Sequence, residues 1–154
     1  MKKAFSVLLV FLLLCTTFGL GLNAAAEGAP TIVESGYCGG EGDGTNLTWT
    51  KDSRNTLTIS GTGRMADFGY YSAIYSDPRN SHPETPWYLN RHNIRTVVIE
   101  DGVTSIGDHA FNGCTGLTSV TLPADVTSIG EYAFYKCGAL ASATLPAGLT
   151  GIGT

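Results

Sequence analysis

Val103–Leu122 reads VTSIGDHAFNGCTGLTSVTL, and this stretch returns at a fixed interval further along the chain. Twenty-three residues on, Val126–Leu145 reads VTSIGEYAFYKCGALASATL, and after the same interval Leu149–Gly153 reads LTGIG. The apolar residues and the glycines keep one register through these copies. Self-similarity at a fixed period of this length is typical of a solenoid, in which each repeat forms one coil of a stack.

Each copy supplies a slice of apolar core that one coil cannot bury by itself. The aligned rings of Phe111 and Phe134 are expected to stack, and replacing either with Ala should cost about 3–5 kcal/mol. Gly107 and Gly130 permit a turn, and the acidic residue after each suits the start of a short helical turn. The predicted core positions are Ile106, Phe111, Cys114, Leu117, Ile129, Phe134, Cys137 and Leu140.

The strand of each coil follows an L-x-x-L-x-L spacing over Ile94–Ile99, Leu117–Leu122 and Leu140–Leu145. A proline closes the second and third of these strands because it lacks a ladder donor. Outward positions on the strands are small and little charged, which suits an extended protein-binding face; a plain solvated sheet face fits the pattern equally well. The candidate face consists of Arg95, Thr96, Val98, Thr118, Ser119, Thr121, Ser142 and Thr144.

The first 26 residues read as a secretory signal peptide. Lys2 and Lys3 precede a long apolar run, and Ala24–Ala26 offers a cleavage site of small residues. A membrane-spanning helix is the alternative, but the run begins at the N-terminus and lacks a positive flank after it. We therefore expect a secreted or cell-surface protein without stable membrane insertion after cleavage.

Three regions are predicted after the signal peptide. Residues 27–45 are rich in glycine and should form a flexible approach, and residues 94–154 hold two full repeats and part of a third. Residues 46–93 should form an N-terminal capping region. Within it, apolar and polar residues alternate in 47–50 and 56–60 about a turn-forming stretch, which predicts a β-hairpin that packs on the first coil.

An irregular, aromatic-rich insert follows the hairpin in this capping region. It either covers the open end of the core, which we favour because terminal repeats must be shielded, or it presents an exposed platform for sugar rings. The candidate platform consists of Tyr70, Tyr71, Tyr75, Trp87 and Tyr88. Thr85 and Pro86 are expected to begin a short helix over residues 86–89.

Composition and residue spacing exclude several classes of function. The chain has 9 Lys and Arg against 13 Asp and Glu, with no basic run, so nucleic acid is a poor partner. The odd number of cysteines after the signal peptide, Cys38, Cys114 and Cys137, argues against a closed disulfide framework, and their spacing lacks the paired C-x-x-C of a zinc site. Cys114 and Cys137 share one repeat position, so we expect these two to be buried, reduced thiols. No catalytic constellation is present, and we predict neither an enzyme nor a cofactor.

The repeat V-T-S-I-G-x-x-A-F-x-x-C-x-x-L-x-x-x-x-L-P resembles the BspA-type leucine-rich repeat of bacteria, which has a 23-residue period. The leader is also similar to that family in LTWT at 47–50, TLTISGTGRM at 56–65 and PWY at 86–88. The resemblance implies a β-rich α/β solenoid, a leucine-rich-repeat stack with an N-terminal hairpin cap. The chain ends within a third repeat, so we expect a truncated or uncapped C-terminal end.

The resemblance also implies the role of a secreted or surface adhesin. The expected function is therefore non-catalytic binding of a protein on a host or bacterial surface. A carbohydrate- or cell-wall-binding module, as the targeting part of a larger cell-wall enzyme, is the alternative. An open strand edge at Ala139–Leu145 would also favour self-association.

Overall fold

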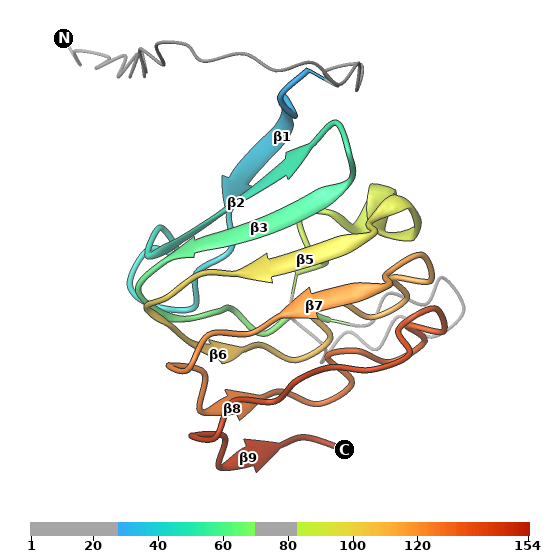
Figure 1. Ribbon diagram of the computed structural model, residues 1–154. Helices are drawn as coiled ribbons and strands as arrows, with labels where there is room; N and C mark the ends of the chain where they lie inside the picture. Colours follow the sequence, from blue (N-terminus) through green and yellow to red (C-terminus); the bar gives the residue numbers. More distant parts are fainter. Residues whose placement is uncertain (1–27, 70–82) are drawn as a thin grey trace, which may run out of the picture.

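Coils of chain descend in order from an N-terminal antiparallel hairpin to the C-terminus in the computed structural model, which describes residues 28–69 and 83–154 (Figure 1). The predicted signal peptide lies outside the described residues. Within the described residues, nine strands form two sheets, in the orders β1-β2-β3-β5-β7 and β4-β6-β8-β9. The five-stranded sheet contains β1 (Ile32–Tyr37), β2 (Leu47–Asp52), β3 (Thr56–Gly61), β5 (Thr96–Ile99) and β7 (Ser119–Thr121). The four-stranded sheet contains β4 (Gly63–Arg64), β6 (Val103–Ile106), β8 (Ser128–Ile129) and β9 (Gly151–Ile152).

Residues that are equivalent in successive sequence repeats pair with one another in the sheets. β5 and β7 pair in parallel with Thr96 opposite Ser119, and in the other sheet Ile106 lies opposite Ile129, which lies opposite Ile152. All these partners are one repeat apart in the sequence. Parallel pairing at the predicted interval follows because equivalent residues of successive coils stack directly on one another.

Threonine hydroxyls strengthen the contact between coils. The side chain of Thr127 donates to the backbone oxygen of Thr104 at 3.2 Å, and that of Thr150 donates to the oxygen of Thr127 at 3.0 Å. These threonines occupy the second position of the V-T-S-I-G motif. Each hydroxyl therefore adds a side-chain bond to the backbone ladder, which accounts for the hydroxyl residue at this repeat position.

The hairpin joins the repeats as part of the same sheet. β2 and β3 are antiparallel, and β3 then runs parallel to β5, with Leu57 beside Val97 and Ile59 beside Ile99. Alternate side chains of these strands point inward and enter one hydrophobic cluster with Val103 of β6. The cluster therefore continues from the hairpin through the first coil without a break.

Three local predictions differ from the structure. The predicted flexible approach over 27–45 contains β1, an edge strand that pairs antiparallel with β2. The helix expected at 86–89 is instead a 3-10 helix, η1 (Tyr88–Asn93), capped at Trp87 without a side-chain hydrogen bond. Residues 140–145 form no strand, and Ala141 there replaces Thr118, whose hydroxyl donates to the Arg95 oxygen at 3.0 Å in the preceding coil.

The segment after the repeat glycine is a run of tight turns rather than a helical turn. Asn112 and Cys114 each donate to the oxygen three residues earlier, at 3.0 and 3.1 Å. The same segment bonds to the next coil, where His109 and Phe111 donate to the oxygens of Glu131 and Ala133 at 2.9 and 2.8 Å. Backbone hydrogen bonds between successive turns take the place of the hydrogen bonds within a helix. The turns therefore form a third ladder of hydrogen bonds, beside those of the two sheets.

Burial decreases from the first repeat to the second. Ile106, Phe111, Cys114 and Leu117 are completely or almost completely buried. In the second copy Ile129 and Cys137 are buried, whereas Phe134 and Leu140 are only partly buried against the core. The first coil is covered on both sides, and this difference sets how much each equivalent position contributes to stability.

Candidate binding surfaces

Part of the predicted binding face lies on neighbouring strands as expected. Thr96 and Val98 of β5 are register partners of Ser119 and Thr121 of β7. The two β7 residues are exposed, and the two β5 residues are half-buried. The four side chains therefore lie on the outer side of the sheet, opposite the buried Val97.

The same face extends onto the hairpin, which sequence reasoning missed. Thr50 is paired with Thr58, Thr58 with Val98 and Val98 with Thr121, so one row crosses four strands and includes one valine. A second row, Thr56, Thr96 and Ser119, carries a hydroxyl on each of three strands. The signal was present as the T-x-T patterns TWT and TLT, but only the parallel pairing of β3 with β5 makes them one surface. The additional outward residues are Thr48, Thr50, Thr56, Thr58 and Ser60.

The remaining predicted face residues lie elsewhere or have structural contacts. Arg95 and Thr118 precede their strands, and the Arg95 Nη1 donates to the oxygen of Gly116 at 3.4 Å. The Thr118 hydroxyl is bonded to the Arg95 backbone. Ser142 and Thr144 are exposed but belong to the segment that forms no strand. The continuous face therefore comprises β2, β3, β5 and β7.

Trp87, one of the residues of the predicted aromatic platform, is buried in the core. This ring is 1% exposed, stacks on Phe111 at a centroid distance of 5.7 Å, and meets Trp49 and Phe68 edge-on at 5.8 Å each. Its Nε1 donates to the backbone oxygen of Ala110 at 2.9 Å. Trp87 therefore belongs to the core and is not part of an exposed platform. Tyr70, Tyr71 and Tyr75 lie outside the described residues.

A different group of rings lines the outer side of the repeat turns. His109 and Tyr132 occupy the same repeat position and stack at 5.2 Å with an angle of 14°. Tyr135 meets Tyr132 edge-on at 5.6 Å, and the two tyrosines are 49% and 46% exposed. Both His109 and Tyr132 have φ of 53°, in the left-handed region that non-glycine residues rarely adopt. This turn conformation directs both rings outward.

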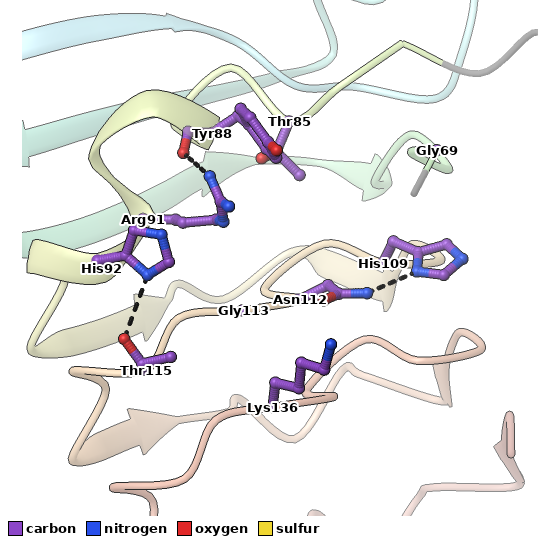
Figure 2. A pocket seen from close by; sticks show the side chains of 10 residues that line it. All are labelled: Gly69, Thr85, Tyr88, Arg91, His92, His109, Asn112, Gly113, Thr115 and Lys136. Atoms are coloured by element: carbon purple, nitrogen blue, oxygen red, sulfur yellow. Dashed lines mark hydrogen bonds between the residues drawn. The ribbon is translucent and has the colours of Figure 1, made fainter. Parts of the chain in front are cut away.

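Beside these rings, a cleft of about 230 Å³ separates η1 from the turns of the repeats (Figure 2). Tyr88, Arg91 and His92 line it from η1, and Lys136 lines it from the second repeat. The other lining residues are Gly69, Thr85, His109, Asn112, Gly113 and Thr115. A shallower hollow of about 320 Å³ shares His109, Asn112 and Lys136 and adds Tyr132 and Tyr135, so the cleft continues along the ring row.

Hydrogen bonds fix several side chains around the cleft. The Arg91 guanidinium lies 3.7 Å from the centre of the Tyr88 ring, and its Nη1 donates to the Tyr88 oxygen. Figure 2 also shows the His92 Nδ1 and the Thr115 hydroxyl, which are 3.2 Å apart, and the Asn112 Nδ2, 2.9 Å from His109 Nδ1. The described part of the lining is basic, since none of its residues within 28–69 and 83–154 is Asp or Glu, whereas the whole chain has a formal net charge of −4.

The three cysteines of the described chain are buried and free. Burial raises the pKa of Cys38 and Cys114 to about 12, and that of Cys137 to about 11. A thiol with so high a pKa is not a nucleophile near neutral pH. The Cys137 Sγ donates to the Phe111 oxygen at 3.2 Å, which links the two repeats inside the core.

The described residues contain neither a cluster of metal ligands nor a membrane-spanning helix. Across residues 28–69 and 83–154, no group of three or more His, Cys, Asp or Glu could hold a metal ion. No helix in these ranges has the length and apolar character needed to cross a membrane.

Stacked parallel coils that repeat at 23 residues, with outward polar positions, define a leucine-rich-repeat protein of bacterial type. The family model described as "BspA type Leucine rich repeat region (6 copies)" matches residues 86–154. Residues 86–154 therefore match the BspA-type leucine-rich-repeat family, which is the family that the sequence predicted. Comparison with curated proteins found no match.

Solved structures of leucine-rich-repeat proteins resemble this chain. A leucine-rich repeat protein from Eubacterium ventriosum is 32% identical with a TM-score of 0.59, over 78% of this chain and 28% of its own. A leucine-rich cell surface protein from Faecalibacterium prausnitzii is 25% identical with a TM-score of 0.39, over 80% of this chain and 33% of its own. The T. pallidum leucine-rich repeat protein is 23% identical with a TM-score of 0.42, over 73% and 53%. The chain thus spans about a quarter to a half of these relatives.

Proposed function

We propose that the chain is a secreted or cell-surface binding module without catalytic activity, which binds a protein of a host or bacterial surface as an adhesin does. The observation that carries this proposal is the outer face of β2, β3, β5 and β7. One row of residues crosses all four strands in register with Val98 as its only residue without a hydroxyl, and a second row carries hydroxyls across β3, β5 and β7. Repeat proteins use extended faces of this kind for recognition. The signal-peptide pattern of residues 1–26 supports export.

The chemistry of this face suits a protein ligand. Threonine side chains offer a methyl group for apolar contact and a hydroxyl that both donates and accepts hydrogen bonds. Charged residues are depleted at the centres of protein interfaces because their desolvation is costly. A wide face of Thr and Ser can therefore be covered at low desolvation cost while each hydroxyl finds a partner.

Binding to immobilised host matrix proteins and bacterial surface proteins tests the proposal. Ser119→Arg and Thr121→Arg place a long charged side chain at exposed positions of the face, and we expect either to weaken binding at least tenfold. Leu89→Arg is the matched control because Leu89 is 87% exposed and lies on η1 rather than on a strand of the face. If both face variants bind like the wild type while folding normally, the ligand does not use this face.

A second function, recognition of carbohydrate or cell wall, is favoured by the rings on the repeat turns. The two half-exposed tyrosines, Tyr132 and Tyr135, stand next to each other and to His109. Exposed aromatic rings with a polar tip can stack on sugar rings while their hydroxyls bond to water or ligand. In this role the chain would serve as the targeting part of a larger cell-wall enzyme.

A glycan array, run beside the protein-binding assay, separates the two functions. Tyr132→Ala and Tyr135→Ala should abolish glycan binding and leave the outer sheet face unchanged, because both rings lie on the turns. Trp87→Ala does not serve this purpose, since that ring is part of the core. Glycan binding that survives both tyrosine substitutions would contradict this second function.

Self-association is a further proposal of ours. The predicted edge at 139–145 forms no strand, but Leu145 and Ile152 are 49% and 59% exposed and are apolar. Apolar side chains next to a short edge strand favour association with another chain. Light scattering over a range of concentrations should show oligomers that Leu145→Glu reduces; a concentration-independent monomer would contradict the proposal.

A further inference from the structure

The cleft between η1 and the repeat turns combines fixed positive charge with neighbouring aromatic rings. Its cationic side chains come from two separate parts of the fold, Arg91 from η1 and Lys136 from the second repeat turn. His92 and His109 add imidazoles from η1 and the first repeat turn. Four basic groups converge on one cleft in a chain with a net negative charge, which is the arrangement expected where an anion is bound.

Two contacts hold the Arg91 guanidinium in one orientation. Its guanidinium is stacked on Tyr88 and bonded to the Tyr88 oxygen, so its orientation is fixed before a ligand arrives. Among residues 28–69 and 83–154, no carboxylate forms an ion pair with Arg91 within 4.0 Å. Arginine has five N–H donors in a planar fork that matches a carboxylate or phosphate. Most of these donors lack a described protein acceptor.

Lys136 reaches the cleft from the opposite wall. Figure 2 shows its side chain rising from the second repeat turn toward the turn that carries Asn112. Its backbone φ is 59°, and the equivalent residue of the first repeat, Gly113, has φ of 73°. A lysine therefore occupies a left-handed position that the preceding coil fills with glycine. This conformation costs more for lysine than for glycine, and that cost is the energetic argument for a functional role of the Lys136 side chain.

We propose that this cleft binds the acidic group of an anionic sugar, with Arg91 and Lys136 on the acidic group and Tyr132 and Tyr135 against the adjoining sugar rings. This inference rests on the carbohydrate-binding function proposed above and names the class of glycan. The volume of about 230 Å³ suits one small charged group or ring rather than a large ligand. The ring-lined hollow that shares three residues with the cleft then accepts the next sugar.

Two sources supply this chemistry, namely sugars with a carboxylate and sugars with a phosphate. An acidic peptide would satisfy Arg91 and Lys136 but would leave the flat tyrosine faces without a matching ring. The structure therefore favours a sugar, and the peptide is kept as an outcome of the test.

Calorimetric titration of the whole chain with glucose, glucuronic acid, glucose 6-phosphate and tetraglutamate tests the inference. Glucuronic acid differs from glucose only in its carboxylate, so the ratio of their affinities isolates the charge. We expect glucuronic acid or glucose 6-phosphate to bind about tenfold more tightly than glucose, with the preference falling as salt is raised. The tighter of the two identifies the source of the acidic group.

Three variants show whether the preference arises in the cleft. Lys136→Gly removes a charge at a position where the first repeat already has glycine, so it should fold, and Arg91→Ala removes the fixed guanidinium. Both should bring the glucuronic acid to glucose ratio close to one. Arg64→Ala removes the same charge at an exposed position on β4 and should leave the ratio unchanged.

Each contrary result overturns a distinct part of the reasoning. Equal binding of glucose and both acidic sugars would remove the acidic-group site and leave carbohydrate binding intact. Absence of binding by every sugar probe would overturn the carbohydrate function as well. Tetraglutamate binding as tight as the acidic sugars would assign the cleft to acidic peptides, and an equal loss of preference in Arg64→Ala would assign the effect to net charge.

Discussion

Replacing Phe111 with Ala removes a ring that is completely buried between two other rings. Phe111 is 0% exposed, lies 5.7 Å from Trp87 at 15°, and lies 5.2 Å from Phe134 at 25°. It therefore joins the insert, the first repeat and the second repeat in one stack. Its loss leaves a cavity in the middle of the core, where the surrounding coils cannot collapse without breaking their backbone ladders.

The expected loss is about 3–5 kcal/mol, the usual range for Phe to Ala in a core. Part of it, about 0.5–1.5 kcal/mol for each stacked pair, goes beyond the area buried. Phe134 has one ring partner of this kind and is only partly buried, so Phe134→Ala should cost about 1–3 kcal/mol. The sequence predicted equal losses of stability at the two positions, whereas the structure predicts a larger loss at Phe111 because only this ring is completely buried.

Urea unfolding of the chain, followed by tryptophan fluorescence, measures the difference. A loss of about 3 kcal/mol should also lower the Tm by roughly 10 °C for a domain of this size. Tyr135→Ala is the control, because it removes an exposed ring from the same turn and should change stability by less than about 0.5 kcal/mol. A Phe134→Ala loss equal to or larger than that of Phe111→Ala would refute the gradient of burial, and wild-type stability of Phe111→Ala would refute the stack.

Three further predictions concern the turns and the thiols. Lys136→Gly should raise the free energy of unfolding by about 0.5–1 kcal/mol, because relief of the left-handed backbone exceeds the entropy lost by glycine; a less stable variant in urea unfolding would show that the side chain compensates for its backbone. Gly107→Ala should cost about 1–3 kcal/mol, since its Cβ would collide with the backbone oxygen of Ala66, and an unchanged Tm would contradict that close approach. Burial raises the pKa of Cys137 from 9.0 to about 11, so the unfolded chain loses this proton first. The stabilisation that comes from the protonated Cys137 thiol is therefore fully present below pH 9 and is lost as the pH rises to 11. Between pH 8 and pH 10.5 the free energy of unfolding of Cys137→Ala should fall by about 1–2 kcal/mol less than that of the wild type. Equal decreases in the two proteins would show that this thiol does not contribute to the pH dependence.

The repeat itself could be predicted because each of its positions has one physical task. Ile106 and Ile129 face the core, and Gly107 lies where a side chain would meet the backbone of Ala66. The role of each such position depends on residues near it in the sequence, so the 23-residue repeat is enough to predict it. The strand at 140–145 was expected by the same logic and is absent, because a parallel strand also needs bonding partners that the period alone does not supply.

The candidate sites were predictable only in part. Thr96, Val98, Ser119 and Thr121 follow from alternation along two strands, and the structure places them side by side. The role of Trp87 was open, since an aromatic residue in an irregular insert suits a core and a platform equally. Its hydrogen bond to the Ala110 oxygen, 23 residues away, decides for the core.

The sequence by itself determined the repeat family, the coil register and the core positions of the first repeat, because these depend on spacing along one chain. Only the tertiary structure decided that the hairpin threonines extend the sheet face and that η1 lies against the repeat turns to form a basic cleft. Arg91 and Lys136 are 45 positions apart and share no pattern. Stacking of the coils brings them to one cleft, and distances across a fold are set by packing rather than by period.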